Sequence, residues 1–164
     1  MILSDTNVLS TFAKIGRLPL LLQLFERAKI GVVPAVYAEL QAGVSSGYVV
    51  LQAAIALIQQ GPIALLMPTA QEIFDKDALP DSFDVGERET LAVAKSRGCQ
   101  VLTNETHVKN WCKRAGIGCW DLPGVLRALW RMNLLTKEQV RELVEQIETK
   151  DRIVFKNKEQ IFQE

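Results

Sequence analysis

The chain has 164 residues, which is the length of one ordinary domain of about 150 residues. Hydrophobic residues make up 48% and charged residues 23%, a composition that excludes a disordered tail. Nineteen basic residues balance nineteen acidic ones, so bulk positive charge cannot hold nucleic acid, although a local basic patch stays open. The single histidine, His107, excludes a zinc site with several histidines.

Three cysteines, Cys99, Cys112 and Cys119, lack both a C-x-x-C pair and zinc-ligand spacing. We expect buried free thiols, as is usual in a reducing cytosol. The acid at residue 5 comes too early for a signal peptide. Glycine, serine, glutamine and proline interrupt the uncharged residues 40–71 before they reach the ~20 residues of a membrane span. These features predict a soluble, cytoplasmic protein without a membrane partner.

Short apolar runs alternate with helical patterns along the chain. The runs over residues 1–4, 30–33, 63–66, 100–103 and 117–120 are typical of buried parallel strands. Helices are predicted over residues 8–15, 18–29, 34–43, 48–60, 85–97, 107–115, 121–132, 137–149 and 154–162. This alternation predicts a three-layer α/β/α fold with a parallel sheet of about five strands. We expect one domain over residues 1–164, in which residues 1–120 form the core and residues 121–164 form C-terminal helices.

Acidic residues recur where such a sheet places its functional site, outside the carboxyl ends of the strands. Asp5 follows the first strand, Glu39 lies in the helix after the second, and Glu105 follows the fourth. Glu87 stands at the start of the helix before the fourth strand. Glycine-rich phosphate loops are missing, because the sequence holds no G-x-G-x-x-G or G-K-[ST] motif.

Most of these acids also have a plain structural interpretation, which the sequence leaves open. Asp5 is a good N-cap, and Glu105 suits the first turn of a helix. Glu87 stands three residues after Asp84, which is the spacing of a capping box. Glu39 is different, because in the last turn of its helix it opposes the helix macrodipole. We expect Glu89, which points to another helix face than Glu87, to be solvated.

Several carboxylates at one site repel one another and take up protons unless a cation joins them. Oxygen ligands favour a hard cation, Mg²⁺ or Mn²⁺. Such an ion polarises a phosphoryl oxygen and lowers the pKa of a bound water, so no histidine base is needed. We therefore expect mutual repulsion to raise the pKa of at least one of Asp5, Glu39 and Glu87.

Four short motifs resemble those of PIN-domain nucleases and come in the order of that family. Residues 4–9 (SDTNVL) are similar to its opening motif, and residues 34–40 (PAVYAEL) to its second. Residues 84–89 (DVGERE) resemble the D-x-G-E-x-E variant of the third, and residues 103–105 (TNE) occupy the fourth. The motifs span residues 1 to about 120, and the segment from there to residue 153 resembles a PIN subfamily of unknown function.

The resemblance implies a VapC-like, metal-dependent endoribonuclease that acts on RNA with Mg²⁺ or Mn²⁺. Proteins of this kind are often dimeric and often paired with an antitoxin protein. Its metal ligands and catalytic residues would be Asp5, Glu39, Glu87 and Glu105. Positions 87 and 105 carry glutamate, whereas the family usually has aspartate, which is one methylene shorter. The longer side chains put ligand geometry and metal affinity in question.

Supporting residues and strand order follow from that ligand set. Asn7 and Thr103 are expected to hold Asp5 by hydrogen bonds, and Asn104 offers only a weaker amide oxygen. If Asp5 and Glu105 share an ion, the first and fourth strands are neighbours. Right-handed crossovers then give the strand order 3-2-1-4-5.

Substrate contact requires a local basic surface, which we expect near the fourth motif. Lys109, Lys113 and Arg114 are the candidate RNA contacts, and Arg127 and Arg131 add charge further along. Solvated helix faces are the alternative interpretation of these residues. The three tryptophans in this stretch are expected in the core, with stacking on a base as the alternative.

Rival enzyme classes fit the sequence poorly. A haloacid-dehalogenase-like phosphatase needs an aspartate where Asn7 stands, and a receiver domain needs an acidic pair and a lysine that are both missing. The serious alternative is a catalytically weak or inactive PIN-like module that binds RNA or a partner protein. We also expect a homodimer, because the uncharged residues 40–71 hold more apolar surface than one sheet face covers.

Overall fold

The computed structural model describes residues 1–164 and shows one parallel sheet of five strands in the order β3-β2-β1-β4-β5. The strands are β1 (Ile2–Ser4), β2 (Ile30–Val32), β3 (Ile63–Leu65), β4 (Gln100–Leu102) and β5 (Cys119–Trp120). Ile2 of β1 pairs with Ile30 of β2 and with Gln100 of β4, so β1 is central. The predicted α/β/α class and strand order are confirmed, with helices on both sides of the sheet.

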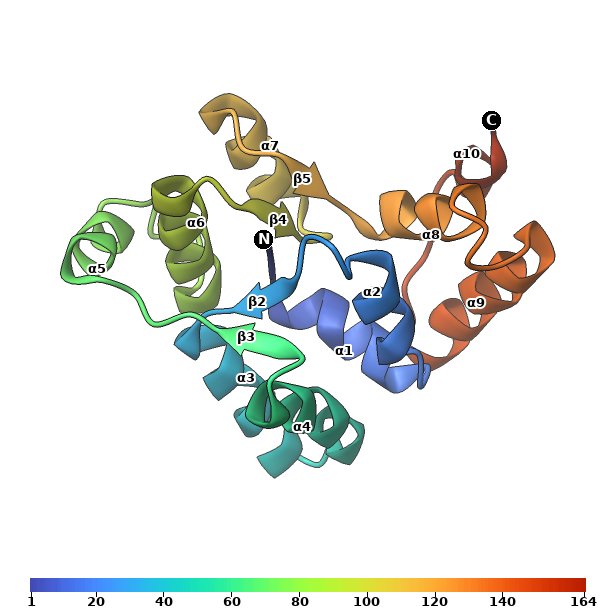
Figure 1. Cartoon of the computed structure of the whole chain (residues 1–164), viewed down its shortest axis with the longest axis horizontal. Helices are drawn as coiled ribbons and strands as arrows, with labels where there is room; N and C mark the ends of the chain where they lie inside the picture. The colour runs from blue at the N-terminus through green and yellow to red at the C-terminus, as the bar shows by residue number, and fades with distance from the viewer.

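Short helices connect and extend the sheet (Figure 1). They are α1 (Thr6–Lys14), α2 (Leu18–Leu24), α3 (Pro34–Ser45), the 3-10 helix η1 (Val49–Leu51), α4 (Gln52–Gln60), α5 (Ala70–Asp77), α6 (Val85–Arg97), α7 (Thr106–Ala115), α8 (Leu122–Arg131), α9 (Lys137–Lys150) and α10 (Lys158–Phe162). Helices α8, α9 and α10 gather at one end of the molecule and α5 lies at the other. No helix combines the length and apolar character that crossing a membrane requires.

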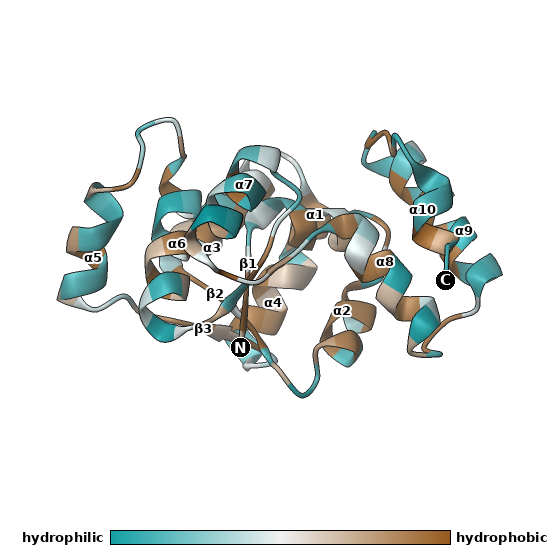
Figure 2. Ribbon diagram, turned by 90° about the horizontal axis from the view of Figure 1, so that it is seen from above, coloured by the Kyte–Doolittle hydropathy of each residue, from teal (hydrophilic) through white to brown (hydrophobic).

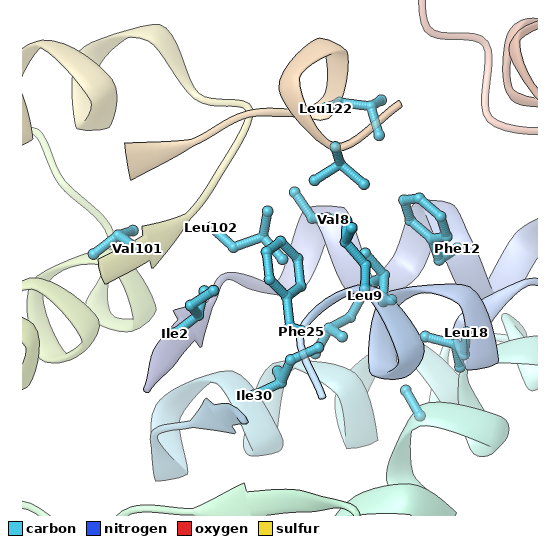
Figure 3. Close-up of a cluster of buried hydrophobic side chains, with 14 of the residues drawn as sticks. Ile2, Val8, Leu9, Phe12, Leu18, Phe25, Ile30, Val101, Leu102 and Leu122 are labelled. Atoms are coloured by element: carbon cyan, nitrogen blue, oxygen red, sulfur yellow. The ribbon is translucent and has the colours of Figure 1, made fainter. Parts of the chain in front are cut away.

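A continuous hydrophobic core joins the sheet to the C-terminal helices. Figure 3 shows its centre, where side chains of α1 meet those of the strands, α2 and α8 (labelled residues Ile2, Val8, Leu9, Phe12, Leu18, Phe25, Ile30, Val101, Leu102 and Leu122). The same cluster extends to Phe162 of α10. Helices α1, α2 and α4 are largely hydrophobic at the centre of the molecule, whereas α9 is mostly hydrophilic (Figure 2). Residues far apart in the sequence are therefore held in one packed body.

Several predicted helices end elsewhere, for identifiable reasons. The helix predicted over residues 18–29 stops at Leu24, and the chain turns through Lys29, whose φ is +68°. Gly43, expected to end its helix, lies inside α3 instead. A Cβ at Gly43 would come within 2.5 Å of Leu51 Cδ1, so the glycine permits close packing of η1. The helix predicted over residues 48–60 is correspondingly divided into η1 and α4.

Helix α5 was not predicted, and an ion pair between a buried carboxylate and a partly exposed arginine fixes it to α6. Thr69 and Glu72 form a capping box at its start. The Glu72 carboxylate is 1% exposed and accepts hydrogen bonds from Arg97 Nε at 2.9 Å and Nη2 at 2.8 Å. The Arg97 guanidinium is the largest cause that lowers the pKa of Glu72, to about 2. The ionised pair therefore holds together at neutral pH.

Replacing Arg97 with methionine is expected to lower the free energy of unfolding by about 2 kcal/mol, because a buried carboxylate loses its charged donors. Urea denaturation at pH 7 measures the change. Arg114→Met, at an exposed position of α7, is the control and should stay within about 0.5 kcal/mol of the wild type. Equal midpoints for the two variants would contradict the assigned role of the Glu72–Arg97 pair.

The C-terminal helices are tied to the core by polar contacts as well as apolar ones. Trp130 Nε1 donates to the Ile161 carbonyl at 2.7 Å, and Lys14 Nζ of α1 contacts Asp151 Oδ1 at 2.6 Å. All three tryptophans are partly buried and pack against the core, as expected. All three cysteines are free, but only Cys112 is buried, and Cys119 is exposed.

Candidate metal centre

Asp5 begins the site at the carboxyl end of β1. It is the N-cap of α1, where its Oδ1 accepts from Val8 N at 2.9 Å. Its Oδ2 accepts from the Thr103 hydroxyl at 2.7 Å, and the residue is 8% exposed. The helix-capping interpretation is therefore correct for Oδ1, while Thr103 fixes the second oxygen as predicted.

Burial determines the acidity of Asp5. Desolvation is the largest effect and raises its pKa to about 6, against the hydrogen bonds from Val8 and Thr103. The carboxylates of Glu105 and Glu87 raise the pKa further by charge repulsion. The expected rise is thus present, but burial rather than mutual repulsion is its main cause. The charges of both acids therefore act on Asp5.

Glu39 reaches the site from α3. The Thr6 hydroxyl donates to its Oε2, and the backbone N–H of Gly86 also bonds it. Burial is the main cause that raises the pKa of Glu39, and the nearby Asp84 and Glu87 add to the rise. A Cβ at Gly86 would come within 2.5 Å of Glu39 Oε1, so a larger residue there would displace the end of the Glu39 side chain. Gly86 therefore leaves room for the carboxylate in its present position.

Glu87 has two roles at the start of α6. Its Oε2 accepts from Asp84 N at 3.0 Å and its own N–H donates to Asp84 Oδ1 at 2.7 Å, which completes a capping box. The same Oε2 lies 3.0 Å from His107 Nε2. The capping alternative is therefore correct, and Glu87 still faces the acidic cluster.

Glu105 and His107 complete the cluster from the start of α7. One ligand atom from each of Glu87, Glu105 and His107 lies within 4.8 Å of the others. Hydrogen bonding to Glu87 is the main cause that raises the pKa of His107. His107 was not among the site residues predicted from the sequence. The available signal was its place two residues after Glu105, at the start of the helix that leaves the same sheet edge.

Three residues differ from their expected surroundings. Asn7 Nδ2 donates to Glu105 Oε1 at 2.7 Å rather than to Asp5. Asn104 Oδ1 accepts from Leu122 N at 3.3 Å and so supports the start of α8. Glu89, expected to be solvated, is buried because it accepts from Ala35 N at 2.9 Å at the start of α3. Side chains on both faces of the α6 N-terminal turn are thus engaged.

The three candidate RNA contacts are not equivalent. Lys109 Nζ lies 3.1 Å from Asp121 Oδ2, so its charge is partly neutralised. Lys113 and Arg114 are exposed in the last turn of α7, where they suit the helix dipole. That turn is about 12 Å along the helix from Glu105, at 1.5 Å per residue. The structure therefore places the two exposed cations away from the carboxylates.

The donor set fits a small divalent cation. The ligand atoms that lie within 4.8 Å of one another come from Glu87, Glu105 and His107. Asp5 and Glu39, which were predicted as ligands, are outside this group, although the charge of Glu87 raises the pKa of both. A carboxylate that burial makes hard to ionise gains most when a cation compensates its charge. The arrangement can hold Mg²⁺ or Mn²⁺ and present it to an anionic substrate.

Comparison with known proteins points in the same direction. The model of the DUF3368 family, described as a PIN domain, matches residues 1–161. No curated protein and no solved structure matches the chain.

Proposed function

Because the chain belongs to the DUF3368 family of PIN domains, we propose that it is a Mg²⁺- or Mn²⁺-dependent endoribonuclease that hydrolyses phosphodiester bonds. The observation that carries the proposal is the close group of ligand atoms from Glu87, Glu105 and His107, with Asp5 and Glu39 subject to charge repulsion from Glu87. Cleavage of RNA by the purified protein, with and without added Mn²⁺, tests it. We further propose that residues 1–164 act as one domain, since the core runs from Ile2 to Phe162.

Each residue has a distinct role in this proposal. The four carboxylates hold the cation, and Thr103, Thr6 and Asn7 fix Asp5, Glu39 and Glu105 respectively by hydrogen bonds. A bound divalent cation supplies Lewis acidity toward a phosphoryl oxygen and lowers the pKa of a coordinated water. The protein itself holds the carboxylates in position despite their mutual charge repulsion.

Two neighbouring cavities supply a path for the RNA strand beside the site. One, of about 240 Å³, is lined by Asn7, Asn104 and Glu105 together with Lys14 and Asp151. Lys14 and Asp151 also line a second cavity of about 480 Å³, whose other walls include Tyr48, Lys150 and Arg152. The wall of the second cavity carries three cationic residues, of which Lys14 pairs with Asp151, and the two cavities share these two paired residues. A basic pocket that adjoins the carboxylates is suited to a phosphate of the substrate.

A matched pair of charge reversals tests this path against the surface of α7. Lys150→Glu with Arg152→Glu is expected to weaken binding of single-stranded RNA about tenfold and to reduce its salt dependence. Lys113→Glu with Arg114→Glu introduces the same charge change at the far end of α7 and should have a smaller effect. Fluorescence anisotropy over a series of salt concentrations measures both. A larger loss for the α7 pair would assign RNA contact to Lys113 and Arg114 instead.

The cellular context remains a proposal drawn from the family. We propose a cytoplasmic, VapC-like protein that pairs with an antitoxin, and a homodimer formed through the segment of residues 40–71. Exposed Val49, Leu65 and Met67 support the apolar interface. Light scattering at tens of micromolar should give twice the chain mass, and a monomeric mass would remove the dimer.

A second candidate function is a PIN-like module that binds RNA or a partner protein without cleaving. Glu87 favours it, because this carboxylate is already engaged by the Asp84 backbone and by His107. The two functions differ in metal dependence. RNA binding that is unchanged by Mn²⁺ and never followed by cleavage would select the module.

A further inference from the structure

His107 stands where a ligand of the cation would stand. Its Nε2 lies 3.0 Å from Glu87 Oε2, and a Glu105 oxygen completes the group within 4.8 Å. Two ligands at neighbouring corners of an octahedron with bonds of about 2.1 Å are about 3.0 Å apart. The spacing of the imidazole nitrogen and the carboxylate oxygen is therefore that of two adjacent ligands.

The imidazole is also held in place for this contact. Its ring packs against the Phe83 ring at a centroid distance of 5.2 Å, and His107 follows the N-cap Glu105 by two residues in α7. Phe83 and Glu87 come from the start of α6, so two elements orient one side chain. The residue is partly exposed, which leaves it accessible to an ion and to solvent.

We propose that His107 is a nitrogen ligand of the cation, together with Glu87 and Glu105, and that it makes the site prefer Mn²⁺ to Mg²⁺. The inference rests on the proposed metal-dependent function. Mn²⁺ and Mg²⁺ both accept oxygen ligands, but Mn²⁺ is the softer ion and accepts an imidazole nitrogen more readily than Mg²⁺ does. An all-oxygen site of the same charge lacks this source of selectivity.

The composition of the chain makes the inference directly measurable. His107 is the only histidine, so an imidazole nitrogen coupled to bound Mn²⁺ can come from no other residue of the chain. The experiment uses the untagged full-length protein with one equivalent of Mn²⁺. Pulsed electron paramagnetic resonance detects the ¹⁴N coupling, and calorimetry measures the affinity for Mn²⁺ and for Mg²⁺.

We expect a ¹⁴N coupling in the wild type that His107→Gln removes. The same substitution should weaken Mn²⁺ binding about tenfold and change Mg²⁺ binding by less than about threefold. Asn110→Gln, at an exposed position of the same helix, is the control and should retain both the coupling and the affinity.

The outcomes separate the inference from the proposed function. Mn²⁺ that binds the wild type without ¹⁴N coupling overturns the role of His107 and leaves the carboxylate site intact. Absence of Mn²⁺ binding overturns the metal-dependent function itself, and the inference with it. A loss of Mg²⁺ affinity in His107→Gln as large as the loss of Mn²⁺ affinity overturns the selectivity.

Discussion

Asp5→Asn is expected to abolish metal-dependent RNA cleavage, with a loss of at least about a hundredfold, since even residues that only support a metal ligand cost about 10–100-fold. Asp5 is the most buried of the four carboxylates and faces both Glu87 and Glu105. The substitution removes one negative charge from the centre of the site. Asparagine caps helices about as well as aspartate, so α1 should remain folded. Loss of activity therefore reports on charge rather than on folding.

Asp121→Asn provides the matched control for this experiment. Asp121 is also a helix N-cap, because its Oδ1 accepts from Gly124 N at 2.9 Å at the start of α8. It is not among the four carboxylates, so its variant should cleave RNA at close to the wild-type rate. Gel-based cleavage of a labelled RNA at equal protein and Mn²⁺ concentrations compares the three proteins. Equal cleavage by Asp5→Asn would mean that a contaminant is responsible, and the binding-module function would then be preferred.

The sheet could be predicted from sequence because its signals are local. Each strand is a short apolar run between polar or glycine residues, and right-handed crossovers leave few possible orders. Helix α5 has no apolar pattern of this kind, because its sequence, AQEIFDKD, is mostly polar, and its one local signal is the capping box of Thr69 and Glu72. Its position depends on Arg97, which is 25 residues away from Glu72 in the chain. Tertiary packing decides this pairing, and no periodic pattern in the sequence predicts it.

The site shows the same division between local and tertiary information. Asp5 and Glu105 were recognisable because they follow strand ends, and Thr103 was correctly predicted to hold Asp5, but the other hydrogen-bond partners were not predicted. Asn7 donates a hydrogen bond to Glu105. Glu89 accepts one from the N-terminus of α3, and both contacts join different elements. His107 was not predicted as a site residue, because a single histidine forms no ligand spacing that can be recognised in the sequence. Its distance from Glu87, 20 residues along the chain, is closed only by the packing of α6 against α7.

The metal-free wild type is expected to lose stability relative to Asp5→Asn as the pH rises from about 4 to 7. The pKa of Asp5 is raised in the folded protein from 3.8 to about 6, so folding favours the protonated carboxyl. Below 3.8 both states are protonated and no difference arises. Above 6 the buried carboxylate is ionised, at a cost of about 3 kcal/mol, since one pKa unit corresponds to 1.36 kcal/mol.

Saturating Mn²⁺ at pH 7 should make the wild type more stable than Asp5→Asn. The ion compensates the Asp5 carboxylate and stabilises the wild type through binding to the folded state, whereas Asp5→Asn binds it more weakly. Urea denaturation of both proteins at pH 4.5, 5.5 and 7, with and without Mn²⁺, measures the two effects. Acid-sensitive pairs such as Glu72–Arg97 occur in both proteins and cancel in the comparison. A difference between wild type and variant that stays constant across this pH range would show that Asp5 is ionised without cost, and its carboxylate would then need no cation.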